Sequence, residues 1–171
     1  GGGIKTIEDC KIYLDLGVDK VSINSLAHSN PYLITQAANY FGSSCVVISI
    51  DVKKIDNTYF VCTDYGRKVT KWKPDEFALF VQNQGAGEIL LNSIDKDGSL
   101  QGYDNFLNDM VSSSVKIPVM ATGGAGNWQH FVDGFKIGNV DAVCTSNIYH
   151  FTEKSIKSAK NYLKGKGINV R

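Results

Sequence analysis

The sequence has few of the residues that mark disulfide-rich, metal-binding or proline-rich proteins. Its 171 residues include only four cysteines, three histidines and three prolines. The cysteines are far apart and form no CxxC pair, so we expect them to remain reduced in a cytoplasmic protein. No histidine has metal-ligand spacing to another histidine or to a carboxylate cluster. We therefore expect neither a disulfide framework nor a metal site.

Long apolar runs and a strong charge imbalance are also missing. No run reaches the roughly 18 apolar residues that a membrane helix needs, and the formal net charge is +1. This composition gives no reason to expect binding to nucleic acid or to a membrane. A chain of this length can bury one hydrophobic core. Because no linker or change of composition interrupts residues 1–171, we expect a single domain.

Short apolar runs alternate with segments of helical periodicity along the chain. This alternation predicts a parallel β-sheet covered by helices, which is the α/β class. Two of the strands, on either side of Tyr65 and Gly66, are instead expected to form a hairpin. Cys45 and Cys144 lie in apolar runs and are expected in buried strands. The expected strands cover residues 20–23, 45–50 (ending at Asp51), 59–63, 67–70, 88–91, 117–122 and 142–145, and the expected helices cover residues 31–40 (with Asn30 as N-cap), 74–84, 105–113, a segment around Trp128, and 155–163.

A repeated pattern relates the two ends of the chain. A pair of glycines is followed, at the same distance in both cases, by an aspartate that leads a short apolar strand, and each strand ends in small polar residues. The pattern predicts a duplicated unit of glycine turn, helix, strand and polar tip, as a duplicated half-barrel would give. The first unit contains Gly1-Gly2, Asp19 and Ile23-Asn24-Ser25, and the second contains Gly123-Gly124, Asp141 and Thr145-Ser146-Asn147.

The glycine turns of this repeat are candidate phosphate sites. Glycine lets backbone N–H groups approach an anion closely, and the N-terminus of the following helix adds a favourable dipole. The polar tip of the next strand can add a hydroxyl or an amide. Two such cradles suit a substrate with a phosphate at each end; the alternative is that the glycines only make tight turns. The first cradle would consist of Gly3, Asn24 and Ser25, and the second of Gly124, Ser146 and Asn147.

Two acidic segments at expected strand ends are further candidates. Asp51 directly follows an apolar run, and a carboxylate at the carboxyl end of a barrel strand points into the active-site mouth. We therefore expect Asp51 to act as a general acid or base between the two cradles. The segment SIDKDG over residues 93–98 lacks the later ligands of a calcium loop. It is better interpreted as a lid or phosphate loop in which Asp97 and Gly98 approach the ligand.

Several segments together resemble one known family. The segments GGGI, DKVSIN, FGSSCVVISID, GAGEILLNSIDKDG, GYD, ATGGAG and HF…GINVR occur in this order. They resemble the cyclase subunit of imidazole glycerol phosphate synthase, from the histidine pathway, over essentially the whole chain. The resemblance implies a (βα)8 TIM barrel of the ribulose-phosphate-binding type. This chain would be its C-terminal portion, from the end of the third strand to the eighth helix.

The resemblance also implies a reaction and a partner. The family uses ammonia to cleave and cyclise a bis-phosphorylated ribulosyl aminoimidazole carboxamide compound, with no cofactor, and releases imidazole glycerol phosphate. The ammonia comes from a glutaminase subunit, which docks on the opposite face of the barrel to form a heterodimer. Two aspartates form the acid/base pair, one at the end of the first strand and one at the end of the fifth.

The family's functional positions can be carried over only where this sequence matches its motifs. Asp51 matches the aspartate of the fifth strand. Asp19 and Lys20 match the end that faces the glutaminase, where the lysine belongs to the ammonia gate. The residues that match one phosphate site are Gly3, Asn24 and Ser25, and those that match the other are Asp97, Gly98 and Gly124, with the tip around Ser146 and Asn147.

Departures from the family's pattern leave two other interpretations open. Ser25 and Asn147 stand where the family usually has threonine and serine, and similar proteins from surface-polysaccharide pathways pair with a glutaminase to form an amidino sugar. Residues 1–171 also do not include the first strands or the first aspartate of the pair. We expect the native protein to have roughly 80 further N-terminal residues. Without them, the third interpretation is a non-catalytic scaffold that activates a glutaminase.

Overall fold

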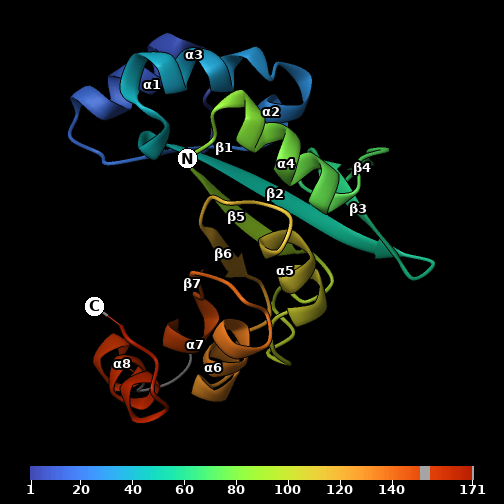
Figure 1. The fold of residues 1–171 in the computed structure, drawn as a ribbon, viewed down its shortest axis with the longest axis vertical. Coiled ribbons are helices and arrows are strands. Elements are labelled where there is room, and N and C mark those ends of the chain that lie inside the picture. Colours follow the sequence, from blue (N-terminus) through green and yellow to red (C-terminus); the bar gives the residue numbers. More distant parts are fainter. Residues whose placement is uncertain (151–154, 171) are drawn as a thin grey trace.

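A computed structural model describes residues 1–150 and 155–170 of the chain. Phe151 and Arg171, which belong to the last motif of the resemblance, lie outside this part. One seven-stranded sheet runs through the described residues, with helices arranged around it (Figure 1). The strands are β1 (Val21–Ile23), β2 (Val46–Ile55), β3 (Thr58–Thr63), β4 (Lys68–Val69), β5 (Glu88–Ser93), β6 (Val119–Thr122) and β7 (Ala142–Val143). The helices are α1 (Ile7–Asp15), α2 (Ser25–Ser29), α3 (Tyr32–Phe41), α4 (Pro74–Gln84), α5 (Asn105–Ser112), α6 (Trp128–Lys136), α7 (Asn147–His150) and α8 (Ile156–Gly165), with a 3-10 turn η1 (Ser43–Cys45).

The parallel part of the sheet follows the order of the chain. Strands β1, β2, β5, β6 and β7 lie side by side and pair in parallel. Successive strand–helix units that add neighbouring parallel strands are the building principle of a (βα)8 barrel. All carboxyl ends of these strands therefore meet at one edge of the sheet, which is where such folds place their functional residues.

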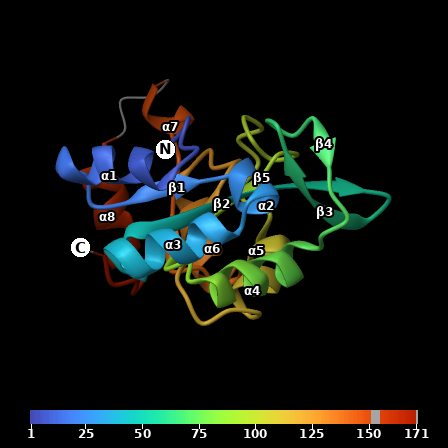
Figure 2. The same cartoon turned by 90° about the horizontal axis from the view of Figure 1, so that it is seen from above.

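The sheet also carries an antiparallel extension. Strand β2 continues beyond its parallel neighbours and pairs with β3, which in turn pairs with β4. The predicted hairpin about Tyr65 and Gly66 is thus confirmed. Figure 2 shows this extension projecting from the side of the molecule away from α1 and α8. It borders the carboxyl edge of the sheet and so can contribute to a site there.

Alternation along β2 separates the core from the functional face. Ile48, Ile50 and Val52 are at most 1% exposed, and burying an aliphatic side chain of this size contributes about 1.5–3 kcal/mol. Ser49 and Asp51 point to the opposite face, because successive side chains of a strand alternate, and both are half-buried. The strand therefore anchors itself in the core with one face and presents polar groups with the other.

Helix α4 illustrates how local signals set the element bounds. Pro74 occupies the first turn, where its missing N–H costs nothing, and Asp75 and Glu76 favour the positive end of the helix dipole. Gly85 ends the helix in the left-handed conformation with φ of 110°. The predicted helix over residues 74–84 is confirmed with the same bounds.

Three expectations about local structure were wrong. Strand β2 does not end at Asp51 but runs to Ile55, because the antiparallel ladder to β3 continues it. Asn30 does not cap α3: its backbone N–H closes α2 by donating to Leu26, and α3 begins after Pro31. Cys45 lies in η1 and Cys144 lies beyond the end of β7, and both are only half-buried.

Within residues 1–150 and 155–170, no helix combines the length and apolar character needed to span a membrane.

Candidate functional site

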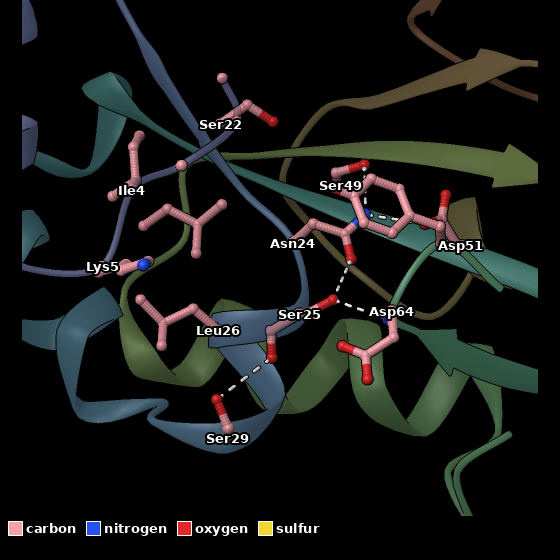
Figure 3. Close-up of a pocket in the computed structure, with 15 residues that line it drawn as sticks. Ile4, Lys5, Ser22, Asn24, Ser25, Leu26, Ser29, Ser49, Asp51 and Asp64 are labelled. Atoms are coloured by element: carbon pink, nitrogen blue, oxygen red, sulfur yellow. Dashed lines mark hydrogen bonds between the residues drawn. The ribbon is translucent and has the colours of Figure 1, made fainter. Parts of the chain in front are cut away.

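A cavity of about 610 Å³ lies at the carboxyl ends of β1 and β2. It collects four of the residues that the sequence singled out: Gly3, Asn24, Ser25 and Asp51. They come from three separate segments of the chain, the N-terminal glycine turn, the end of β1 with the start of α2, and β2. Figure 3 shows Asn24 and Asp51 directed toward one another at one side of the cavity. The structure thus brings the predicted first cradle and the predicted acid/base together.

Two amide side chains hold the carboxylate of Asp51. Asn24 donates from Nδ2 to Oδ2 of Asp51 at 2.9 Å, and Asn92 donates from Nδ2 to Oδ1 at 3.0 Å. Asn92 is available because the parallel register places it opposite Asp51. Asn24 also donates to the hydroxyl of Ser49 at 3.3 Å. Each carboxylate oxygen can accept a further hydrogen bond, so an oriented acceptor faces the cavity.

The hydroxyl of Ser25 connects the first cradle to the hairpin. It accepts a hydrogen bond from the backbone N–H of Asp64 at 3.0 Å and lies 3.5 Å from the side-chain oxygen of Asn24. The carboxylate of Asp64 in turn pairs with Lys68 at 2.6 Å. Ser25 therefore fixes the loop that closes one side of the cavity, in addition to lining it.

Sequence reasoning missed several residues of this cavity. Among the described residues that line the cavity, Lys5 is the one lysine. Figure 3 shows Lys5 on the side of the cavity away from Asp51. Ser49 could have been found from the alternation of β2, because it lies two residues before Asp51 on the same face. Asp64 and Tyr65 belong to the predicted hairpin, but they reach the cavity only because the hairpin packs against Ser25, and the sequence carried no signal for that contact.

A second, much narrower cavity lies at the carboxyl ends of β5, β6 and β7. Its volume is about 30 Å³. It contains the whole of the second predicted set, which comprises Asp97, Gly98, Gly124, Ser146 and Asn147. Thr122, which sequence reasoning missed, and Thr145, which begins the predicted polar tip, complete its polar lining, and each lies at or just after the end of a strand. The two cradles thus share the carboxyl edge of one sheet.

Gly124 is required by a close approach of two backbone segments. Its φ is 105°, and a Cβ atom at this position would lie 2.2 Å from the carbonyl oxygen of Gly102. The backbone N–H of Gly102 donates to the carbonyl of Gly124 at 2.8 Å. The turn after β6 therefore rests directly on the loop after β5, which leaves no room for a side chain.

The loop after β5 also forms hydrogen bonds with the antiparallel extension, through residues of β2 and β3. The backbone N–H of Lys54 donates to the carboxylate of Asp95 at 2.7 Å. The hydroxyl of Tyr59 donates to the carboxylate of Asp104 at 2.9 Å to one oxygen and 3.1 Å to the other. Burial is the main cause that raises the pKa of Tyr59 above its ordinary value, and the hydrogen bond to Asp104 raises the pKa further. This hydroxyl therefore stays protonated and remains a donor. The strand of Asp51 and the loop of Asp97 are thus one connected unit.

Asp19 and Lys20 lie at the other edge of the sheet. They directly precede β1 and so mark the amino ends of the strands. The ammonium of Lys20 donates to Glu88 at 2.7 Å and to the carbonyl of Ser44 at 2.9 Å. Glu88 was missed, although a charged residue that opens an otherwise apolar strand is a recognisable signal. The structure therefore separates Lys20 from Asp51 by the length of the strands.

Potential metal ligands do not gather in the part of the chain that the structure describes. No group of three or more histidine, cysteine, aspartate or glutamate residues there is placed to hold an ion. The chemistry of the site, as far as these residues go, is that of a held carboxylate, amides, hydroxyls and backbone N–H groups.

Comparisons with known proteins point in one direction. The family model described as histidine biosynthesis protein matches residues 1–155. Imidazole glycerol phosphate synthase subunit HisF of Chlorobaculum tepidum is 49% identical over 171 residues, which cover the whole of this chain and 68% of that protein. The subunit HisF of Bacillus subtilis is 48% identical over 173 residues, with 100% and 69% of the two chains covered. That of Chlorobium chlorochromatii is 47% identical over 171 residues, again the whole chain and 68% of the relative.

Proposed function

The chain belongs to the histidine biosynthesis protein family, and we propose that it supplies the cyclase site of an imidazole glycerol phosphate synthase. Its parallel sheet and helices are part of the (βα)8 TIM barrel of that family. We propose that residues 1–171 belong to a single barrel domain. The reaction is the ammonia-dependent cleavage and cyclisation of a bis-phosphorylated ribulosyl aminoimidazole carboxamide to imidazole glycerol phosphate.

One observation carries this proposal: Asp51 stands on the same sheet edge as two cradles. A substrate with a phosphate at each end can bind one cradle with each phosphate. The first cradle offers the backbone of the N-terminal glycines and the ammonium of Lys5. The second offers the backbone N–H groups around Gly98 and Gly124 and the polar tip of β7. Asp97 lines this cavity, and its backbone N–H donates to the carbonyl of Ser93 at 3.0 Å, so we propose that it shapes the loop that presents Gly98.

Asp51 is the residue that moves protons. Its two amide partners donate hydrogen bonds to the carboxylate and accept none from it. They therefore orient the carboxylate without taking over its role as proton acceptor. The free lone pairs face the cavity, where the reacting part of the substrate lies between its phosphates. The resemblance implies that a second carboxylate, on the first strand of the family's barrel, completes the acid/base pair.

Replacing Asp51 with asparagine tests this role. In the protein expressed from its native start, Asp51→Asn is expected to lower ammonia-dependent turnover by about 10²–10⁴-fold, the usual contribution of a general acid or base. Substrate affinity, measured by calorimetry, should change little, because the amide retains the shape of the side chain. Asp109→Asn, on the exposed face of α5, is the matched control and should behave as the wild type. Near-normal turnover in Asp51→Asn contradicts the proposal.

The relatives are named as subunits of a synthase, so a partner subunit is expected for this chain as well. We propose that it is a glutaminase, that the two form a heterodimer, and that it docks at the amino edge near Asp19 and Lys20. Support comes from the ion pair of Lys20 with Glu88 at this edge, 2.7 Å long. A charged pair at the amino ends of the strands is suited to guard the entrance for ammonia from that side.

The variant Glu88→Gln tests the partner-facing role. It removes the charge that holds Lys20 and leaves the carboxyl edge unchanged. Glutamine-dependent turnover with the glutaminase present should fall severalfold, whereas turnover with added ammonia should stay close to the wild-type value. Equal losses with both nitrogen sources would show that Glu88 acts on the cyclase site itself.

The amidino-sugar alternative is less well supported, because the relatives named above carry the histidine-pathway name. Turnover of the histidine-pathway substrate decides between the two. The scaffold alternative predicts that the protein stimulates a glutaminase but turns over no cyclase substrate. The oriented carboxylate of Asp51 favours an enzyme over a scaffold.

A further inference from the structure

One segment of the resemblance has no role in the proposed reaction. The residues Gly102, Tyr103 and Asp104 (GYD) lie between the loop after β5 and the start of α5. Gly102 donates its N–H to the turn after β6, and Asp104 accepts from the hydroxyl of Tyr59 on β3. Tyr103 donates its hydroxyl to the backbone carbonyl of Cys144 at 2.9 Å. Three consecutive residues thus form hydrogen bonds to three different segments: the turn after β6, the segment after β7, and β3.

The bond of Tyr103 lies directly before the polar tip of β7. Cys144 immediately precedes Thr145, Ser146 and Asn147 in the chain. Strand β7 is only two residues long, so few ladder bonds hold the tip in place. Beyond the strand, the N–H of Cys144 donates to the carbonyl of Ala121 at 2.8 Å. The hydroxyl of Tyr103 supplies the corresponding bond to the carbonyl, so the peptide before the tip is held on both sides.

The position of the tip matters because the second cradle is narrow. A cavity of about 30 Å³ leaves little freedom, and hydrogen bonds weaken steeply once distance or angle departs from its optimum. Tyr103 is 5% exposed. Burial raises the pKa of its hydroxyl above the ordinary value, so the hydroxyl remains a donor throughout the working pH range.

We propose that Tyr103 is a positioning residue for phosphate binding: its hydroxyl holds the carbonyl of Cys144 and thereby sets Ser146 and Asn147 opposite Gly98 and Gly124. This inference rests on the proposed function, in which the second cradle binds one phosphate of the substrate. Tyr103 does not touch the phosphate. It acts through the backbone that carries the tip.

The ring of Tyr103 has a separate packing role that the test must leave intact. Its centroid lies 6.3 Å from that of Phe131, and a Cβ atom at Gly134 would lie 3.3 Å from the ring. The variant Tyr103→Phe keeps this packing and removes only the hydroxyl. Tyr162→Phe is the matched control, because its hydroxyl also donates one hydrogen bond, to Gln129 at 3.0 Å, but on the outer helices.

Steady-state kinetics of the protein expressed from its native start provide the first readout. We expect Tyr103→Phe to raise KM about fivefold and to leave kcat within about twofold, the effect of losing one hydrogen bond used in binding alone. Tyr162→Phe should match the wild type in both constants. An unchanged KM in a folded Tyr103→Phe protein overturns the inference, as does an equal loss in kcat.

Titration with inorganic phosphate, followed by amide NMR, provides a readout that does not need turnover. In Tyr103→Phe the dissociation constant reported by the amides of Gly98 and Gly124 should rise about fivefold, whereas that reported by Gly3 should stay the same. If the wild type turns over no substrate but this difference appears, the proposed function fails and the positioning role stands. Equal phosphate binding in both proteins, or none at the second cradle, overturns the positioning role.

A second variant guards against a Tyr103→Phe protein that does not fold. Gly102→Ala acts on the other end of the same segment: φ is 100°, and the nearest atom to its new Cβ would be in the His130 ring at 3.5 Å. It strains the backbone without a steric clash. The same rise in KM is expected, and its absence overturns the inference.

Discussion

The turn at Gly124 allows a sharp test of how the second cradle is built. The variant Gly124→Ala adds one methyl group where φ is 105° and where the carbonyl oxygen of Gly102 would lie 2.2 Å away. Gly167, in the turn after α8, has φ of 77°, and a Cβ atom at this position would have no other atom within 4 Å. The two alanine variants therefore share the backbone strain, and only one of them adds a clash.

The expected loss of stability in each variant follows from the backbone strain and, for Gly124→Ala alone, from the clash and one lost hydrogen bond. A left-handed conformation costs an L-residue about 1–2 kcal/mol, and this is the whole effect expected for Gly167→Ala. Real Cβ atoms essentially never come within 3.0 Å of a heavy atom outside their own residue and its chain neighbours, so Gly124→Ala must push the two backbone segments apart. Overpacking typically costs a further 1–3 kcal/mol, in round terms about 2 kcal/mol. The hydrogen bond between Gly102 and Gly124 adds about 1 kcal/mol, which gives a total of about 4–5 kcal/mol.

Urea unfolding of both variants measures the difference in stability, and the phosphate titration measures the effect on the cradle. Gly124→Ala should lose phosphate binding at Gly98, and Gly167→Ala should retain it. Equal losses of stability in the two variants would refute the claim that the contact with Gly102 constrains this turn. Unchanged phosphate binding in Gly124→Ala would refute the second cradle itself.

Two further predictions concern stability. Ile48→Ala, at a position that is 0% exposed, should lower the free energy of unfolding by about 2–5 kcal/mol, whereas Ile137→Ala, at a position that is 61% exposed, should change it little; similar urea midpoints for both would contradict the assigned core. The raised pKa values of Tyr59 and Tyr103 predict a loss of stability at alkaline pH. Since the unfolded tyrosine loses its proton near pH 10 and the folded one only at higher pH, the folded state binds more protons in this window, and stability falls as pH rises through it. The double variant Tyr59→Phe with Tyr103→Phe should show a shallower fall above pH 10, and an unchanged slope would contradict this.

The sequence was sufficient for the order of the strands and of the longer helices, but not for the short helices α2 and α7 or for the contacts between elements. Asp51 could be predicted because an ionisable residue directly follows an apolar run. Its partner Asn92 could not, because the register between β2 and β5 that places them side by side depends on packing of the whole sheet. The continuation of β2 was hidden for a related reason. Lys53 and Lys54 are exposed and resemble a loop, and only pairing with β3 makes them part of a strand.

The repeat predicted the carboxyl edge of the sheet better than the amino edge. At the carboxyl edge, both glycine turns and both polar tips line cavities, although the cavities differ greatly in volume. At the amino edge the two equivalent aspartates differ. Asp141 accepts a hydrogen bond from the N–H of Val119 at 2.9 Å and so fixes the pairing of β6 with β7. Asp19 is exposed, and the lysine after it pairs with Glu88.

This difference has a physical reason. A phosphate makes the same demands on every cradle, namely free backbone N–H groups and a conformation that only glycine adopts easily, so the pattern persists in sequence. An aspartate before a strand meets no such fixed demand, because either a backbone N–H or solvent satisfies its carboxylate. Internal symmetry therefore predicts the anion sites that we propose, whereas the proposed role of Asp19 and Lys20 depends on what lies against the amino edge.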